Sequence, residues 1–191
     1  MFDQIHQYYK NLLPELTDEA WAYCTERFTV RSVKKGEFLL REGEICRYVS
    51  FINSGTLYGY RLEEGKETVV GIFLENSYVS EYASFLQRKP STFSIVALED
   101  AEIVDFSYDD IQNGYNQFKV MERFGRYIAE YLFMSFDERI YSLHSLSAEQ
   151  RYQNLVNTNP TIFQRVPQYL IASYLGISPE ALSRIRKRLS S

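Results

Sequence analysis

The stretch that decides the fold is Gln168-Tyr-Leu-Ile-Ala-Ser-Tyr-Leu-Gly176-Ile-Ser178-Pro179-Glu180-Ala-Leu-Ser-Arg184-Ile-Arg-Lys-Arg188-Leu-Ser-Ser191. It predicts one helix that ends near Leu175 and a second helix that begins after Ser178. Gly176 lies between them and tolerates the positive φ of a tight turn. Ser178 is a favourable N-cap, and proline suits the first helical position after it. The pattern therefore indicates a helix-turn-helix.

The second of these helices is basic on its outer side. Leu182, Ile185 and Leu189 repeat at helical spacing, so we expect them to face inward. The side chains left on or near the outer face are Ser183, Arg184, Arg186, Lys187 and Arg188. A capped helix with such a face, placed after a turn glycine, favours contact with DNA. The alternative is a structural helical hairpin whose charged face is only solvated.

The charge of the chain is unevenly distributed. The formal net charge is -4, which on its own argues against a nucleic-acid partner. Residues 151–191, however, contain six basic side chains and one acidic one, whereas the first 150 residues contain 15 basic and 24 acidic side chains. An acidic body with a basic end is compatible with DNA binding, because phosphate neutralisation needs only a local patch.

Several classes of protein are not supported by the sequence. Cys24 and Cys46 are the only cysteines and have no metal-like spacing, and His6 and His144 lie outside the β-rich region, so we expect no metal and no cofactor. No catalytic constellation stands out, so we expect no enzyme and no catalytic residue. No secretory signal or membrane span is evident, so we expect a cytoplasmic protein with no membrane partner.

Residues 29–107 have the pattern of a β domain. Short runs rich in β-branched and aromatic residues are separated by glycine turns. We expect strands over residues 29–33, 38–40, 48–54, 55–62, 67–74, 91–97 and 101–107, and a short helix near 80–87. Many short strands without long helices between them predict an antiparallel β-roll of jelly-roll type. With helices on both sides of it, the fold class is α+β.

Helical periodicity flanks this β domain. Residues 1–28 are expected to form two helices that cover the roll, the second capped by Thr17. A long helix is expected from about residue 117, with an apolar seam of Met121, Phe124, Ile128, Tyr131 and Ser135. Steps of three and four residues favour a dimer seam, and the alternative is a helix that packs on the roll.

The boundary between the long helix and the C-terminal domain is marked by a capping box, in which Ser147 is the N-cap and Gln150 follows three residues later. We therefore expect three domains. Residues 1–113 form the roll with its N-terminal helices, residues 114–145 form the long dimerisation helix, and residues 146–191 form the helix-turn-helix domain.

Taken in order, these pieces resemble the CRP/FNR (catabolite activator protein) family of bacterial transcription regulators over essentially the whole chain. The motifs that carry the resemblance are Lys35-Gly36-Glu37, Glu42-Gly43, Ser54-Gly55, Leu98-Glu99-Asp100-Ala101-Glu102, Arg165-Val166-Pro167 and Ile171-Ala-Ser-Tyr-Leu-Gly-Ile-Ser178. The family joins a β-roll of the cyclic-nucleotide-binding type, a long dimerisation helix and a winged helix-turn-helix. Because the sequence stops at Ser191, we expect a helix-turn-helix without an extended wing.

The resemblance implies a set of DNA-contacting residues. Glu180, Ser183 and Arg184 match the family's base- and backbone-contacting positions, and Pro179 stands where the family has an arginine. Arginine reads guanine and glutamate reads cytosine in the major groove, while basic side chains hold phosphates. The full expected set is Gln168, Ser173, Ser178, Pro179, Glu180, Ser183, Arg184, Arg186, Lys187 and Arg188.

The resemblance also places an effector site, but its phosphate-binding cassette is degraded. Nucleotide-binding members have a Gly-Glu pair and a later Arg-Ser/Thr pair, which here become Ser80-Glu81 and Ser91-Thr92. A missing arginine costs a charge-assisted hydrogen bond of about 1.5–3 kcal/mol, so cyclic AMP is not the expected effector. The candidate effector contacts are Ser80, Glu81, Tyr82, Ala83, Ser91, Thr92, Phe136 and Asp137.

Together these observations predict a homodimeric, sequence-specific DNA-binding transcription regulator of CRP/FNR type. Its expected partners are a near-palindromic double-stranded DNA site and a second copy of itself. RNA polymerase and a small-molecule effector are further partners that the resemblance allows, although no residue identifies a polymerase contact. The alternative is a module that binds a cyclic nucleotide or other small molecule and whose C-terminal helices bind a protein rather than DNA.

Overall fold

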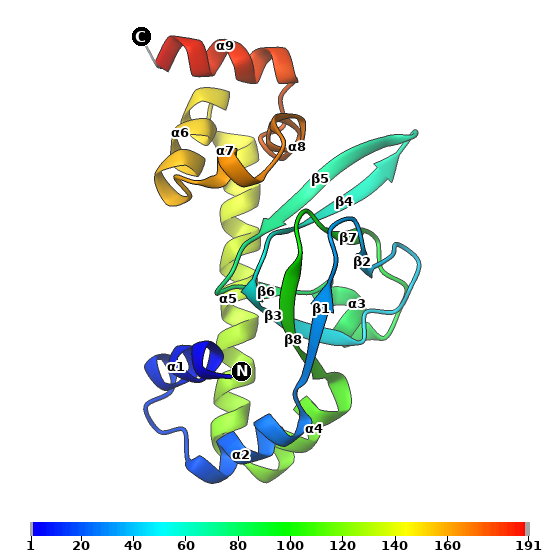
Figure 1. The fold of residues 1–191 in the computed structure, drawn as a ribbon, viewed down its shortest axis with the longest axis vertical. Coiled ribbons are helices and arrows are strands. Elements are labelled where there is room, and N and C mark those ends of the chain that lie inside the picture. Colours follow the sequence, from blue (N-terminus) through cyan, green and yellow to red (C-terminus); the bar gives the residue numbers. More distant parts are fainter. Residues whose placement is uncertain (1, 190–191) are drawn as a thin grey trace.

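A computed structural model describes residues 2–189 and shows a β-roll, a long helix and a helical end (Figure 1). The roll consists of two four-stranded antiparallel sheets, with the strand orders β1-β8-β3-β6 and β2-β7-β4-β5. The strands are β1 (Thr29–Val33), β2 (Phe38–Leu40), β3 (Tyr48–Ser54), β4 (Leu57–Glu63), β5 (Lys66–Phe73), β6 (Tyr78–Val79), β7 (Ser94–Ala97) and β8 (Ala101–Ser107). The predicted fold class is confirmed.

The strand predictions differ in accuracy for a physical reason. β1, β2, β3 and β8 have the bounds that we expected, because glycine turns or abrupt changes in hydrophobicity mark their ends. β7 begins at Ser94 rather than at Ser91, since the Ser91 hydroxyl binds the Phe93 carbonyl in a local turn. The two-residue strand β6 was not predicted, because it is too short to show a period.

The helices are α1 (Asp3–Leu12), α2 (Asp18–Arg27), α3 (Tyr82–Gln87), α4 (Tyr108–Gln117), α5 (Lys119–Ser145), α6 (Ala148–Thr158), α7 (Ile162–Arg165), α8 (Gln168–Tyr174) and α9 (Pro179–Leu189). The caps at Thr17 and Ser147 are confirmed, the second with both bonds of the capping box. The long helix α5 begins at Lys119 rather than at 114 or 117. Phe118 separates it from α4 by adopting an extended backbone and packing against Tyr23 at 5.4 Å between ring centroids.

The core of the roll lies between the two sheets. Phe51, Ile52, Leu57, Ile95 and Ile103 are fully buried there, and each contributes about 1.5–3 kcal/mol by leaving water. The first half of α5 packs on this roll, with α1 beside it, and its second half runs on to the C-terminal helices (Figure 1). One long helix thus links the roll to the helical end of the molecule.

Candidate nucleic-acid interface

Helices α8 and α9 form the helix-turn-helix that the sequence predicts. Gly176 adopts a φ of +66°, the positive value that the tight turn between the two helices requires. The Ser178 hydroxyl accepts a hydrogen bond from the Ala181 backbone N–H at 3.2 Å and so caps α9. Leu170, Ala172 and Leu182 are buried where the helices meet. This packing fixes α9 at the end of the molecule, above α6 and α8 in Figure 1.

The outward face of α9 is polar and basic. Glu180, Ser183, Arg184 and Lys187 are all exposed. The pKa of Glu180 is lowered, first by a side-chain hydrogen bond with Ser178, so the carboxylate is ionised at neutral pH. Charged acceptor and donor groups are therefore presented together on one exposed helical surface.

Two of the expected basic contacts turn back onto the protein. The Arg186 guanidinium lies 4.8 Å from the centre of the Phe163 ring, and Arg188 forms an ion pair with Glu149 of α6. Both side chains therefore flank the outward face and also brace α9 against α6 and α7. The sequence could not show this, because both partners lie in separate helices whose docking depends on the tertiary fold.

The expected DNA contact Ser173 has a different role in this arrangement. Its hydroxyl accepts a hydrogen bond from the Val69 backbone N–H of β5 at 3.0 Å and lies 3.4 Å from the Glu67 carbonyl oxygen. Because the roll engages this hydroxyl, Ser173 does not belong to the exposed face. Gln168 is exposed in the first turn of α8, while Ser178 and Pro179 are exposed at the start of α9.

Arg165 forms an ionic link between the helical end and the roll. Its guanidinium bonds to Glu75 at 2.7 Å and to Glu99 at 2.5 Å. Tyr58, Val69 and Val96 of the roll share one buried cluster with the helix-turn-helix core. Arg165 is therefore neutralised by the roll, so the basic excess of the C-terminal residues is not all available to DNA.

This link predicts an acid-sensitive contribution to stability. Burial acts to raise the pKa of Glu99, but hydrogen bonds from Arg165 and Thr56 outweigh it and lower the pKa. A lowered folded-state pKa means that the contribution is present above the ordinary glutamate range and is lost as pH falls through the lowered value. Because the side chain is 38% exposed, we expect less than about 1 kcal/mol.

The measurement is thermal unfolding between neutral pH and pH 3. Glu99→Gln is expected to reduce the fall in melting temperature on acidification relative to the unmodified protein. The control is Glu64→Gln, because Glu64 is exposed in the turn between β4 and β5. Equal acid dependence in the unmodified protein and in Glu99→Gln would contradict the prediction.

Two further arginines hold the turn of the helix-turn-helix in place. Arg139 of α5 donates to the Tyr174 carbonyl and lies 4.0 Å from the centre of the Tyr174 ring. Arg151 donates from Nε to the Leu175 carbonyl at 2.8 Å and from Nη1 to the Leu146 carbonyl at 2.5 Å. Both satisfy carbonyls left open at the end of α8. They tie the orientation of α9 to the long helix, and sequence reasoning missed both roles.

The predicted dimer seam needs a correction. Met121, Phe124 and Ile128 are buried inside the protomer; Phe124, for example, contacts Tyr9 at 4.3 Å between ring centroids. The first half of α5 is therefore a helix packed on the roll, which was the alternative interpretation. Tyr131 lines a cavity, and the Ser135 hydroxyl donates to the Tyr131 carbonyl.

A different row of apolar residues is exposed on the second half of α5. It consists of Phe133, Phe136, Ile140 and Leu143, which are 71%, 66%, 43% and 40% exposed. They follow one another at steps of three, four and three residues, the spacing of the a and d positions of a coiled coil. We call them the α5 row. Such a row is costly in water and is typical of a helix–helix interface.

The cassette residues are satisfied by the protein itself. Glu81 is buried and accepts from the Ser84 backbone N–H at 2.6 Å, which caps α3. The Ser80 hydroxyl donates to the Tyr48 carbonyl at 3.1 Å, and Arg61 donates to the Thr92 hydroxyl at 3.2 Å.

The other expected effector contacts differ in their burial. Tyr82 is partly buried, stacking on Phe85 at 5.8 Å between ring centroids, and Ala83 is exposed. Phe136 and Asp137 are exposed on α5, so neither side chain is buried against the cassette within one protomer. Phe136 and Asp137 therefore do not close a site over the cassette within one protomer.

Comparisons with known proteins agree with this architecture. Residues 30–118 match the cyclic nucleotide-binding domain. A protein from Eubacterium rectale that is assigned to the CRP/FNR family of transcriptional regulators superimposes with a TM-score of 0.72, at 17% identity, over 96% of this chain and 88% of that one. The chain has the CRP/FNR fold.

Two further structures with the CRP/FNR fold are similar. FixK2 from Bradyrhizobium japonicum has a TM-score of 0.70 at 16% identity, over 85% of this chain and 84% of that one. The catabolite activator protein of Thermus thermophilus has a TM-score of 0.58 at 19% identity, over 94% and 86%. No curated protein matches the chain in sequence. Among residues 2–189, no helix is long and apolar enough to cross a membrane.

Proposed function

We propose that the protein is a homodimeric, sequence-specific DNA-binding transcription regulator. The observation that carries the proposal is the outward face of α9, where Arg184, Ser183 and Glu180 are exposed together on a capped helix. Arginine and glutamate on the first turns of such a helix can reach base edges in the major groove, and Lys187 can hold a phosphate. No catalytic step is needed for this activity.

The α5 row supports the dimeric part of the proposal. Pairing of two copies along this row would place two copies of α9 on either side of a two-fold axis. Two recognition helices related in this way fit successive major grooves about 34 Å apart on a near-palindromic site. Arg139 and Arg151 tie α8 to α5 and α6, so the geometry of the row would be transmitted to the DNA-reading face.

Replacing Arg184 by alanine tests the proposal. On a site selected from random DNA, Arg184→Ala is expected to bind at least about tenfold more weakly and with relaxed sequence preference, because a base contact is lost in each protomer. Fluorescence anisotropy at several salt concentrations measures both quantities. Lys10→Ala, which removes an exposed charge on α1, is the matched control and should bind as the unmodified protein does.

The salt dependence separates the proposal from its alternative. DNA binding requires the logarithm of the binding constant to fall by about 0.9 per phosphate contact for each tenfold rise in salt. If the C-terminal helices bind a protein partner instead, the affinity for DNA would be low. The association with that protein partner would then depend only weakly on salt. Unchanged affinity and unchanged sequence preference in Arg184→Ala would refute the assignment.

A further inference from the structure

The helix-turn-helix is docked on one edge of the roll. β5 is the last strand of its sheet, so one side of its backbone has no neighbouring strand. Helix α8 lies beside that edge (Figure 1), where the Ser173 hydroxyl accepts the Val69 N–H at 3.0 Å and lies 3.4 Å from the Glu67 carbonyl oxygen. If α8 left this edge, water could satisfy both backbone groups.

Apolar side chains extend the contact beyond these hydrogen bonds. Tyr58, Val69 and Val96 of the roll belong to the same buried cluster as Leu170 and Ala172 of α8. The cluster removes apolar surface of both parts from water, which is the main favourable contribution to docking. The helical end and the roll are thus held together as long as this cluster stays closed.

The ionic part of the contact includes an unfavourable element. Arg165 bonds to Glu75 at 2.7 Å and to Glu99 at 2.5 Å. The second carboxylate oxygen of Glu75 is buried and accepts no hydrogen bond from the described residues. A carboxylate oxygen that leaves water without a partner offsets part of the attraction in the ion pair. A competing partner for Arg165 therefore has less to overcome than the two ion pairs suggest.

DNA has the charge of such a competing partner. The first 150 residues contain 15 basic and 24 acidic side chains, whereas residues 151–191 contain six basic side chains and one acidic one. Docking sets this basic end against the acidic body, and Glu75 and Glu99 neutralise Arg165 as DNA phosphates would. We propose that the docked contact is autoinhibitory. The roll competes with DNA for the helical end, which binds DNA tightly only after α8 has left β5.

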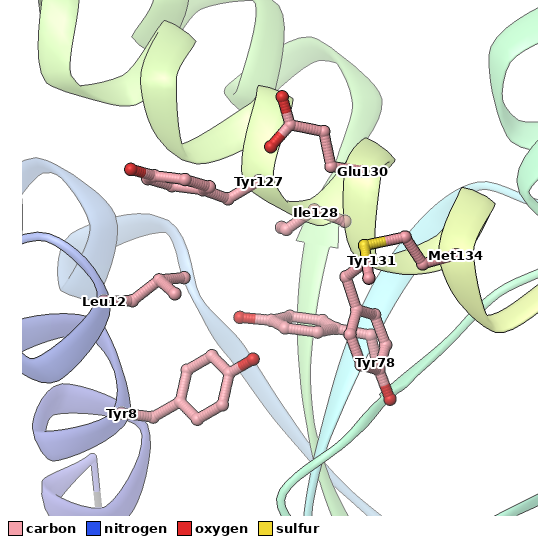
Figure 2. Close-up of a pocket in the computed structure, with 8 residues that line it drawn as sticks. All are labelled: Tyr8, Leu12, Tyr78, Tyr127, Ile128, Glu130, Tyr131 and Met134. Atoms are coloured by element: carbon pink, nitrogen blue, oxygen red, sulfur yellow. The ribbon is translucent and has the colours of Figure 1, made fainter.

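The moving part is the helical end, because the first half of α5 is fixed to the roll. Ile128 is buried there and lines the cavity beside Tyr78, between α1, β6 and α5 (Figure 2). Between α5 and α6 the chain has two residues with extended backbone, Leu146 and Ser147. Rotation at these residues can carry α8 from β5, and the long side chain of Arg139 can follow the carbonyl that it binds at the end of α8.

Hydrogen exchange measured by NMR detects this opening in the absence of DNA. The Val69 N–H is bonded to α8, so its exchange reports on undocking. Val104 lies in β8, between β1 and β3, and reports on opening of the roll itself. We expect the Val69 amide to exchange at least about tenfold faster than the Val104 amide. Equal exchange rates would show that the helical end does not open separately, which would overturn the proposal.

Val69→Ala tests the consequence for DNA binding without changing any charge. The loss of two methyl groups from the shared cluster should shift the docking equilibrium about tenfold towards the undocked state. Because affinity scales with the undocked fraction, binding to a selected DNA site should tighten by up to about tenfold in fluorescence anisotropy. Val33→Ala is the matched control, since Val33 is equally buried in the core between the sheets. It should leave DNA affinity unchanged.

Glu99→Gln tests the ionic part of the same contact. Weakening its ion pair with Arg165 should tighten DNA binding by about two- to fivefold and speed exchange at Val69. The control is Glu15→Gln, because Glu15 is similarly exposed and forms an ion pair with Arg123, away from the helical end. It should change neither quantity.

The proposal rests on the proposed function, and the two can fail separately. If the unmodified protein binds a selected site and Val69→Ala binds it no more tightly, the contact is not autoinhibitory although the protein is a DNA-binding regulator. Weaker binding in Val69→Ala would make the docked state the DNA-reading state and would also overturn the proposal. If neither the unmodified protein nor any variant binds DNA, the proposed function fails, and autoinhibition of DNA binding fails with it.

Discussion

Under the proposed function, replacing Phe136 by glutamate is expected to convert the proposed dimer to a monomer and to weaken binding to a selected DNA site on the order of a hundredfold or more. Phe136 is 66% exposed and lies at the centre of the α5 row, with Phe133 before it and Ile140 after it. Burial of each of these side chains against a second copy contributes about 1.5–3 kcal/mol. A glutamate there would bring two unpaired carboxylates together at the two-fold axis, which costs several kcal/mol.

The expected loss of DNA affinity follows from symmetry. Two linked recognition helices bind two half-sites as one unit, whereas a monomer must bind each half-site independently. Light scattering coupled to gel filtration measures the mass, and fluorescence anisotropy measures the DNA affinity. Leu62→Glu is the matched control, since Leu62 is 57% exposed on β4, away from α5. A variant Phe136→Glu that remains dimeric at micromolar concentration would show that α5 does not form the interface.

The position of this row shows what helical periodicity can and cannot determine. Apolar residues recur at steps of three and four along all of α5, so the sequence predicts a long amphipathic helix. The periodicity alone does not show which face of each half of α5 is buried. Met121, Phe124 and Ile128 are covered because α1, α2 and the roll pack on them, and this choice depends on contacts far apart in the sequence.

The helix-turn-helix and the caps were predictable because their determinants are local. Ser147 bonds Gln150 three residues away, and Ser178 bonds the N–H of Ala181. Arg165 is the opposite case, because Glu99 and Glu75 lie 66 and 90 positions from it. No pattern in the sequence pairs these charges. For the same reason the Ser173 hydroxyl could not be assigned to β5 before the fold was known.

The cassette illustrates a third situation, in which the departure from the family's pattern is visible in the sequence itself. Ser91 stands in the place of an arginine, and in the structure its hydroxyl donates to the Phe93 carbonyl at 2.7 Å. The Glu81 carboxylate accepts a hydrogen bond from the Ser84 backbone N–H and so caps α3. The cavity beside Tyr78 was not predicted, because it forms between α1, β6 and α5 and no local motif marks it.

The second large effect is expected for Gly55→Ala, which should lower the free energy of unfolding by about 2–5 kcal/mol. Gly55 lies where the chain passes from β3 in one sheet to β4 in the other, with a φ of +97°. A β-carbon there would lie 2.6 Å from Ala101 Cβ, 2.7 Å from Ala101 Cα and 2.9 Å from the Asp100 carbonyl oxygen. Two of these three atoms are backbone, so they cannot rotate away.

The control separates backbone strain from steric overlap. Gly36 has a φ of +80°, but a β-carbon there meets nothing within 4 Å, so Gly36→Ala should cost only about 1–2 kcal/mol. Urea denaturation of both variants measures the difference. Equal losses would mean that Ala101 moves aside freely. Because Glu99 next to this segment binds Arg165, we also expect Gly55→Ala, unlike Gly36→Ala, to loosen the helix-turn-helix from the roll.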